Sequence, residues 1–526
     1  MEKFFYELKS TSGASDRDVI LAKDTILYPI MMRILFKRVW LLVSALGAFA
    51  TAAVGESLPN IILINIDDLG YADISPFGGR ISTPNLERMA KEGMKLTSHY
   101  AAPVCSPSRA AMMTGCYPKR VLPIPGVLFP AAAVGLNPAE QTIAEVLRAK
   151  GYSTACIGKW HLGDQPEFLP TAQGFDHYFG IPYSNDMGKG SEGSKSNPGS
   201  PLPKENPQKD ALRKAQPTDG TGLRGEAQPP LPLLEDSDVV ERVKVTEQHT
   251  FTRRYTERAL KYIREHEQKP FFLYLPHNAV HFPHYPHDDF IGKSGGGLQN
   301  DWVMEVDESA GQILAALRES KLDQKTLVIF TSDNGGPLNY QSNNMPLRGG
   351  KGSTLEGGIR VCTIAWWPGK IPSGSQTHAI TSHMDWLPTF AAVCSAKVPD
   401  DRKIDGKDIS ALLFARPNAA GHHVFHYYSG FHLQAVRSGP WKLHLDKNEL
   451  YHLESDIGET VNVAHTNPGI VENLRAEADK MIADLGDKTA DAPGVRPLGR
   501  VDNPSPLISQ DGTVRHGFDK RYKVLP

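Results

Sequence analysis

The sequence has few cysteines, little net charge and no apolar run long enough to cross a membrane. A formal charge of −2 at pH 7 gives no general affinity for nucleic acid or an acidic membrane surface, so any anion site has to come from a local cluster. The apolar run in residues 39–50 is shorter than the roughly 20 residues that a span needs. The five cysteines are too few and too scattered for a disulfide framework, and their odd number leaves at least one unpaired: Cys105, Cys116, Cys156, Cys362 and Cys394.

Asn-x-Ser/Thr sequons are also absent. For an exported protein of this size, that absence favours a bacterial periplasm or exterior over a glycosylated route through the endoplasmic reticulum. Residues 31–38 are basic, residues 39–50 are apolar and small residues follow, which is the pattern of a secretory signal. We expect translation to start at Met31 or Met32 and the exported, mature protein to begin near residues 55–57, without a stable membrane anchor.

Length and composition indicate a multidomain globular protein. A chain of 526 residues corresponds to roughly two to four domains, and 40% hydrophobic with 22% charged residues is ordinary for a globular chain. We expect an N-terminal extension and signal in residues 1–56 (the signal in about 31–55), a catalytic domain in residues 57–400, and a C-terminal α+β domain and tail in residues 401–526.

Apolar segments alternate with helical patterns through the predicted catalytic domain. Four of these segments are typical of strands buried on both faces, and they begin at Asn60, Tyr152, Phe271 and Thr326. The alternation predicts an α/β fold, with a mostly parallel central sheet flanked by helices. Each of the four strands is followed by polar residues at its carboxyl end, the edge where open α/β sheets bind ligands.

Two regions depart from this alternation. Residues 186–235 are rich in Gly, Ser, Pro, Lys and Glu, which predicts a long irregular insertion that is either a functional lid or disordered. After about residue 401, short alternating segments predict an antiparallel sheet, followed by a helix in about residues 468–485 and an extended tail.

An oxygen-only set of side chains follows two of the strands. It comprises Asp67, Asp68, Asp333 and Asn334. Carboxylate and amide oxygens suit a hard divalent cation, and three carboxylates favour Ca²⁺ over Mg²⁺, which usually retains more water. Either pair alone could be a solvated turn. Two pairs at one sheet edge favour a shared metal site.

A second set is basic, comprising Arg109, Lys159, His161, His281 and Lys351. Lys351 lies in the Gly-rich segment 347–358, which lets the backbone approach a ligand closely. Singly, each residue is most often an ordinary surface charge or polar group. Together with a cation they would form an electropositive pocket for a tetrahedral anion. Three further histidines surround His281 in the sequence and are substrate-pocket candidates: His277, His284 and His287.

The segment around Cys105 is predicted to be a loop that turns into a helix, because Pro107 is tolerated in a first turn and Ala110 to Met113 are good helix formers. The Cys105 sulfur would then lie beside free backbone N–H groups, a ready anion site. For a lone cysteine, a small buried thiol with a packing role is the alternative interpretation.

With these residues placed, the chain closely resembles the sulfatase family, and within it the arylsulfatase A type. Cys105 to Arg109, Cys-Ser-Pro-Ser-Arg, matches the family's C-x-P-S-R signature. Other family blocks are matched at residues 158–163, 180–184, 332–335, 350–358 and 449–460. The resemblance runs from about Pro59 into the C-terminal domain, and it implies an alkaline-phosphatase-like α/β domain followed by a small sheet domain.

The resemblance implies an enzyme that hydrolyses sulfate monoesters of aryl alcohols or carbohydrates to the alcohol and inorganic sulfate. Cys105 would be converted by a formylglycine-generating maturation enzyme to formylglycine (3-oxoalanine). Its hydrated aldehyde would attack sulfur, and the second hydroxyl would then expel sulfate. The implied ligands of Ca²⁺, or of Mg²⁺, are Asp67, Asp68, Cys105 in its modified form, Asp333 and Asn334.

The resemblance also assigns the basic groups as catalytic residues. Arg109 and His161 would sustain the aldehyde hydrate. The sulfate group would be bound by Lys159, Ser184, His281 and Lys351. His281 or Lys351 would then give a proton to the leaving oxygen.

Two departures from the family pattern stand out. Cys116 occupies a position where the family often has arginine, and residues 186–235 lack the cysteines that staple the related region of animal enzymes. The same pocket and metal would also suit a phosphate or phosphonate monoester, which is the alternative function. A binding protein without activity is disfavoured because every assigned residue is present.

Overall fold

The computed structural model describes residues 58–203 and 219–522. The predicted signal and the alternative start sites lie outside this part of the chain. The main sheet, given with its strands in spatial order, consists of β11 (Ser375–Thr377), β2 (Met94–Tyr100), β10 (Arg360–Trp366), β9 (Thr326–Ser332), β1 (Asn60–Ile66), β8 (Phe271–His277), β4 (Ser153–Ile157), β5 (His177–Gly180), β6 (Leu231–Glu235) and β7 (Asp238–Val243), with β12 (Thr381–Ser382) paired to β2.

The centre of this sheet is parallel, as the sequence predicted. Strand β1 pairs in parallel with β8 on one side and with β9 on the other, and β8 pairs in parallel with β4. Antiparallel pairs flank this centre, where β10 meets β9 and where β6 meets β5. The predicted α/β class, with a mostly parallel sheet, is confirmed.

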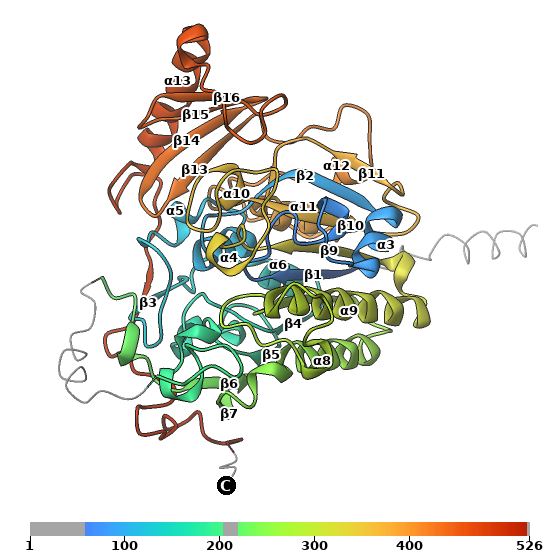
Figure 1. The fold of residues 1–526 in the computed structure, drawn as a ribbon, viewed down its shortest axis with the longest axis vertical. Helices are drawn as coiled ribbons and strands as arrows, with labels where there is room; N and C mark the ends of the chain where they lie inside the picture. The colour runs from blue at the N-terminus through green and yellow to red at the C-terminus, as the bar shows by residue number, and fades with distance from the viewer. Residues whose placement is uncertain (1–57, 204–218, 523–526) are drawn as a thin grey trace, which may run out of the picture. The chain divides into compact units, whose positions relative to one another are not determined.

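Helices cover both faces of the sheet (Figure 1). On β1, Ile61 and Leu63 enter one hydrophobic cluster while Ile62 and Ile64 enter the other, because neighbouring side chains of a strand point to opposite faces. The first cluster includes residues of α4 (Cys105–Thr114), α6 (Ile143–Ala149) and α11 (Trp386–Val393). The second includes residues of α3 (Pro84–Glu92), α8 (Phe251–Glu265) and α9 (Leu298–Glu319).

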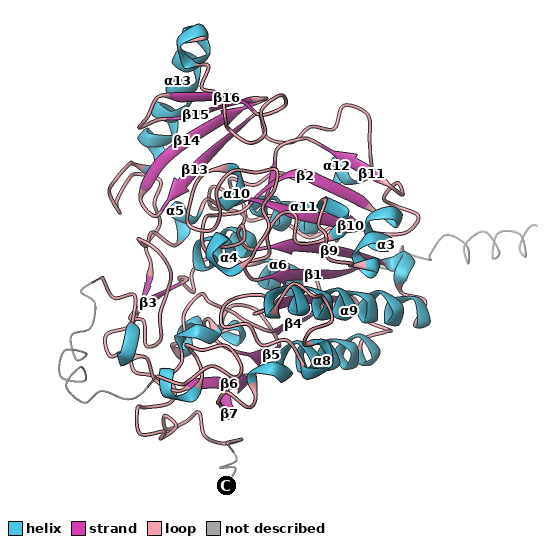
Figure 2. Ribbon diagram, in the orientation of Figure 1, coloured by secondary structure: helices cyan, strands magenta, loops and turns pink. Residues whose placement is uncertain are grey.

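A second, antiparallel sheet forms after residue 401, as predicted (Figure 2). It consists of β13 (Val424–Ser429), β14 (His432–Ser438), β15 (Trp441–His444) and β16 (Glu449–His452), and α13 (Pro468–Leu485) shares its hydrophobic cluster. The other short α-helices and strands of the described residues are α5 (Pro118–Val121), α10 (Glu356–Ile359), α12 (Ser410–Leu413) and the pair of β3 (Val134–Gly135) with β17 (Gly499–Arg500). The domain boundary near residue 400 stays a prediction.

The predicted irregular insertion is only partly irregular. Its described residues include short 3-10 turns at Asn185–Met187, Gly190–Glu192 and Gly225–Ala227. Its last five residues form β6 rather than a loop, because the apolar Leu231, Leu233 and Leu234 are buried when β6 pairs with β7 and β5. The expectation of irregular structure through Glu235 was therefore wrong for this end of the segment.

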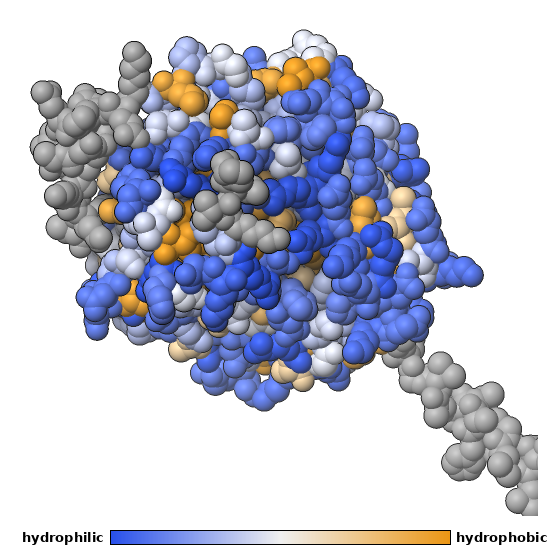
Figure 3. All heavy atoms as spheres, turned by 90° about the horizontal axis from the view of Figure 1, so that it is seen from below, coloured by the Kyte–Doolittle hydropathy of each residue, from blue (hydrophilic) through white to orange (hydrophobic). Residues whose placement is uncertain are grey.

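All five cysteines are buried and unpaired, so the structure contains no disulfide framework. Within residues 58–203 and 219–522, none of the helices combines the length and the hydropathy needed to cross a bilayer. The face drawn in Figure 3 is mostly hydrophilic with scattered apolar groups.

Candidate active site

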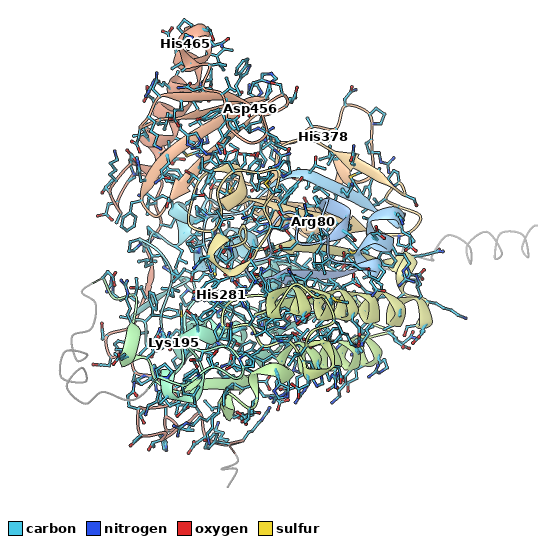
Figure 4. All side chains as sticks on the ribbon, viewed as in Figure 1. Arg80, Lys195, His281, His378, Asp456 and His465 are labelled. Carbon is cyan, nitrogen blue, oxygen red and sulfur yellow. The ribbon has the colours of Figure 1, made fainter. Side chains whose placement is uncertain are left out.

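The carboxyl ends of the central strands meet at one edge of the sheet and bring the predicted polar residues together. Ile66 is level with Ser332 of β9 and with His277 of β8. The chains continue side by side beyond these ends, since Asp67 N donates to Ala279 O at 2.8 Å and Asp333 N donates to Ile66 O at 3.0 Å. His281, labelled in Figure 4, lies at the same side of the central strands as α4.

Helix α4 begins at Cys105, as predicted, after Val104 in an extended conformation. The Cys105 side chain is buried, and its Sγ lies 3.4 Å from Asp67 Oδ1. Burial and the charge of Asp67 together raise the pKa of the thiol well above its ordinary value. The sulfur thus lies at the floor of the site, beside the acidic residues, and favours its neutral form.

Asp67 is held by two buried cations. Lys159 Nζ forms a short ion pair with Asp67 Oδ2, and Arg109 Nη2 lies 3.4 Å from the same oxygen. Burial opposes ionisation of Asp67, but the positive charges of Lys159 and Arg109 outweigh it and hold its pKa well below the usual range. Gly158, between β4 and Lys159, lets the chain pass close to β8, because a Cβ on Gly158 would lie 1.9 Å from Pro276 O.

Asp333 and Asn334 lie beside Asp67 and Asp68 at the buried side of the site. Arg109 donates from Nε and Nη2 to Asp333 Oδ2 at 3.0 and 2.8 Å, a geometry that a lysine could not reproduce. Asp333 Oδ1 accepts from the backbone N–H of Asp68 at 3.2 Å, and Asn334 Nδ2 donates to Asp68 Oδ1 at 2.7 Å. Burial and the charge of Asp67 raise the pKa of Asp333.

Lys351 and His281 line the more open side of the site, and the buried Ser184 lies behind His281. Lys351 Nζ lies 2.6 Å from Asp68 Oδ1, and its side chain is 21% exposed, whereas Lys159 is fully buried. His281 Nε2 lies 3.7 Å from Asp68 Oδ2, and its Nδ1 lies 3.3 Å from Ser184 Oγ. A substrate would reach the site from this side.

His161 also lies in this region. Its Nε2 is 2.9 Å from Leu128 O, while its Nδ1 is buried without a hydrogen-bond partner. Burial, followed by the charges of Lys159 and Arg109, lowers its pKa well below the ordinary value. A neutral His161 that donates from Nε2 to Leu128 O leaves Nδ1 as a free acceptor.

The donor set fits a hard cation. Ligand atoms of Asp67, Asp68, Cys105 and His281 all lie within 4.8 Å of one another. The predicted ligand Asn334 lies beside this group, and its Oδ1 is buried without a partner, which is expensive unless something binds it. The structure adds His281 to the residues around the predicted metal position, a role that sequence spacing could not indicate.

The three additional histidines lie in different surroundings. His277 lies in the core, where its Nε2 is 3.2 Å from Ser309 Oγ of α9, and burial lowers its pKa to about 3. His287 accepts at Nδ1 from Asp289 N and so caps the short 3-10 helix Asp288–Phe290. Only His284 stays close to the site. The prediction of all three as pocket residues is therefore wrong for His277, which lies in the core, and for His287, which caps a turn.

A second buried charged cluster, which the sequence reasoning missed, fixes the loop that carries Lys351. Lys442 Nζ of β15 donates to Glu356 Oε1 and contacts Glu459 Oε1, both at 2.9 Å, and donates to Thr354 O at 2.8 Å. Glu459 Oε2 accepts from Glu356 N at 2.8 Å. Burial opposes ionisation of Glu356, but Lys442 and neighbouring arginines outweigh it and lower its pKa.

The departure at Cys116 also has a structural account. Arg496, from the C-terminal tail, donates from Nη2 to Cys116 Sγ at 3.2 Å and from Nε to Glu140 at 2.7 Å. A guanidinium therefore does contact this position, although it comes from a distant part of the chain.

Known proteins match most of this chain. The family model described as Sulfatase matches residues 59–395. Arylsulfatase A of Homo sapiens is 38% identical over 476 residues, which cover 82% of this chain and 89% of that protein. N-acetylgalactosamine-6-sulfatase of Mus musculus is 36% identical over 427 residues, covering 77% and 75%.

Solved structures match over a similar extent. Ps i-CgsB, in complex with k-i-k-neocarrahexaose, has a TM-score of 0.66 at 30% identity, covering 81% of this chain and 93% of that one. The PsFucS1 sulfatase from Pseudoalteromonas sp. has a TM-score of 0.71 at 26% identity, covering 84% and 93%. Phosphonate monoester hydrolase SpPMH from Silicibacter pomeroyi, at 17% identity and a TM-score of 0.56, shares the fold alone.

Proposed function

The chain belongs to the sulfatase family and is a sulfuric ester hydrolase, and we propose that it cleaves sulfate monoesters of carbohydrates or aryl alcohols with a formylglycine at position 105 and a bound divalent cation. The resemblance inferred from the sequence motifs is thereby confirmed at the level of the family. The observation that carries the proposal is the convergence of Cys105, Asp67, Asp68 and His281, whose ligand atoms lie within 4.8 Å of one another.

The buried side of the site is suited to a nucleophile. A formylglycine hydrate at position 105 would supply one hydroxyl to attack sulfur and a second to release sulfate. Lys159 and Arg109 fix Asp67 beside this position, and Arg109 also holds Asp333 with two hydrogen bonds. His161 Nδ1, buried and unpaired, is an acceptor available to a hydroxyl in the same region.

The open side is suited to the leaving group. Lys351 and His281 both reach Asp68 from the exposed side, and Ser184 contacts His281. These donors would bind the sulfate oxygens, and either His281 or Lys351 would protonate the leaving oxygen, which points toward solvent when sulfur faces position 105.

Charge balance supports a bound cation. The carboxylates Asp67, Asp68 and Asp333 are matched by three cations, Arg109, Lys159 and Lys351. An anionic ester added to this neutral set would be uncompensated in a buried site. A divalent cation held by the three carboxylates and Asn334 Oδ1 would supply the missing positive charge, and oxygen donors favour Ca²⁺, with Mg²⁺ as the alternative.

We further propose that the chain is exported, with its mature N-terminus near residues 55–57, and that a formylglycine-generating enzyme modifies Cys105. Mass spectrometry of the secreted protein tests the first point. A mature chain that retains Met1 would contradict it.

Rates on matched aryl sulfate and aryl phosphate esters test the proposed reaction. We expect the aryl sulfate to have the larger kcat/KM with Ca²⁺ present. Clearly faster turnover of the phosphate would instead support the alternative, a phosphate or phosphonate monoester hydrolase. Retained ligand binding by Cys105→Ala, with no ester cleaved by the unsubstituted protein, would indicate a binding protein.

A further inference from the structure

The open side of the site continues into a small apolar and aromatic surface. Phe282 directly follows His281, and its carbonyl oxygen lies 2.5 Å from His281 Nδ1. The Phe282 ring stacks on Tyr340, with centroids 4.5 Å apart and planes only 6° from parallel. Both rings are half-buried. An aromatic pair therefore lies immediately beside one of the two candidate proton donors.

A leucine connects this pair to the second candidate donor. Leu338 is 62% exposed, and its Cγ lies only 3.0 Å from where a Cβ on Gly350 would stand. Gly350 immediately precedes Lys351, so Leu338 lies over the loop that carries the Lys351 amine. Leu338 and Tyr340 are the ends of one 3-10 turn, Leu338–Tyr340, which thus reaches from the Lys351 loop to Phe282.

His284 adds a polar group to this surface. Its ring meets Phe282 and Tyr340 edge-on, with centroid distances of 5.9 and 5.7 Å. The residue is 5% exposed, and its Nε2 has no hydrogen-bond partner. Burial, with a smaller effect from His281, lowers its pKa to about 4, so the ring is neutral at pH 7 and offers one donor and one acceptor.

We propose that Phe282, His284, Leu338 and Tyr340 form a ring-binding subsite that accepts the pyranose ring of a sulfated saccharide as the leaving group. This inference rests on the proposed function, because it assumes that the leaving oxygen lies between His281 and Lys351. The stacked pair and Leu338 offer apolar contact to the C–H face of a sugar. His284 offers a hydrogen bond to one of its hydroxyls.

The unpaired Nε2 of His284 allows the subsite to discriminate between a sugar and a plain aryl group. An aryl ring would cover the subsite without giving His284 Nε2 a partner, and leaving a buried polar atom unsatisfied is costly. A hydroxyl-bearing ring satisfies that atom and still covers the apolar surface. The subsite therefore favours a carbohydrate sulfate over an aryl sulfate with equally good leaving-group contacts.

The experiment compares kcat/KM on a panel of monosulfated methyl pyranosides with kcat/KM on 4-nitrophenyl sulfate. His284→Phe keeps an apolar ring but removes the hydrogen-bonding nitrogens, so we expect the pyranoside-to-aryl ratio to fall by about tenfold or more. His284→Gln should restore part of that ratio. Tyr340→Ala should raise KM for the pyranoside. Phe431→Ala is the matched control, because Phe431 is a half-buried aromatic between β13 and β14.

A measurement on the unsubstituted protein covers the case in which a variant does not fold. The desulfated methyl pyranoside should inhibit 4-nitrophenyl sulfate turnover more strongly than phenol does. An unchanged pyranoside-to-aryl ratio in both His284→Phe and Tyr340→Ala, or stronger inhibition by phenol, would overturn the subsite while leaving the sulfatase assignment intact. If the formylglycine-bearing protein cleaves no sulfate ester at all, the proposed function itself fails.

Discussion

At the scale of single residues, the unmodified thiol at position 105 is poorly suited to act as the nucleophile. The side chain is buried, and burial together with Asp67 raises its pKa, so little thiolate would form at neutral pH. A plain thiol also lacks the second hydroxyl that would release sulfate. The environment of Cys105 therefore favours modification over direct use of the sulfur.

Peptide mass spectrometry across residues 104–109 should find formylglycine at position 105 in active preparations. Cys105→Ala should lose activity by a factor on the order of 10³ or more, because no nucleophile remains. Cys394→Ala, which alters another buried, unpaired cysteine, is the control and should stay active. A fully active preparation with an unmodified thiol would refute the mechanism.

The proton donor can be identified by varying the leaving group of the substrate. Losing a general acid costs about 10²–10⁴-fold when the leaving alcohol is a poor one, and much less when it is a good one. Across a series of aryl sulfates with leaving groups of rising pKa, the variant of the true donor, His281→Ala or Lys351→Ala, should lose progressively more activity. The other variant should lose a constant factor. Equal slopes for both variants would assign the proton to neither.

Removal of the cation should lower both activity and stability. A ligand present at 100 times its Kd stabilises the native state by about 2.7 kcal/mol, so chelation should lower the melting temperature, and added Ca²⁺ should restore it. Asn334→Ala should weaken this Ca²⁺ response, because the unpaired Oδ1 is lost. Differential scanning calorimetry with and without EDTA measures the shift; identical transitions would argue against a metal at this position.

At the scale of elements, the strands were the most predictable part of the molecule. Continuous apolar segments identified β1, β8 and β9, and parallel pairing of strands that end together brought Asp67 and Asp333 to one edge. Strand β10, which is antiparallel to both β9 and β2, was not predicted, because an apolar segment does not show which strand it pairs with or in which direction.

Side-chain direction limited the prediction of the site. His277 and His281 lie on the same segment, yet His277, still within β8, points into the core toward Ser309, whereas His281, past its end, reaches Asp68. Sequence spacing alone does not show where a strand stops. The ring pair Phe282 and Tyr340 was likewise invisible, because its members are more than fifty positions apart.

Helix α9 carries a buried acid that makes stability depend on pH. Glu305 is 4% exposed, its Oε2 accepts from His287 N at 2.9 Å, and its Oε1 has no partner. Burial raises its pKa to about 8, opposed by the hydrogen bond from His287 N and by Arg253, and assisted by Glu308 and Asp289. Because the folded state holds this proton more tightly than the unfolded state does, stability falls as pH rises from about 4.5 toward 8.

Glu305→Gln should abolish this decrease in the free energy of unfolding with rising pH. Relative to the variant, the unsubstituted protein should lose about 3–5 kcal/mol of unfolding free energy between pH 5 and pH 8.5, at about 1.4 kcal/mol for each pH unit. Urea unfolding at several pH values measures this difference. Glu319→Gln, which alters an exposed glutamate at the end of the same helix, is the control. Parallel pH profiles for Glu305→Gln and the unsubstituted protein would show that Glu305 ionises normally.

At the scale of the whole molecule, the C-terminal sheet helps to hold a loop of the candidate active site. Lys442 of β15 reaches across to Glu356 and to Thr354 O, at the end of the loop that carries Lys351. Arg348, at the start of that loop, donates to Glu459 O at 2.8 Å. Both ends of the loop are thus fixed by residues that follow the antiparallel sheet or belong to it.

Lys442→Met should therefore impair catalysis from a distance. Removing Lys442 takes away the cation that two buried carboxylates, Glu356 and Glu459, share, which should cost about 3–5 kcal/mol of unfolding free energy. A shift of Lys351 of about 1 Å should lower kcat/KM on an aryl sulfate by on the order of 10²-fold. Lys447→Met, which removes an exposed lysine between β15 and β16, should do neither.

A double-mutant cycle separates positioning from simple loss of fold. If Lys442 acts by placing the Lys351 amine, then Lys442→Met should cost little further activity in a Lys351→Ala background, because the group being placed is gone. If the substitution merely lowers the amount of folded enzyme, the two losses in kcat/KM should multiply, and raising the protein's stability with Ca²⁺ should recover activity. Kinetics on folded protein, checked by circular dichroism at the assay temperature, decide between these outcomes.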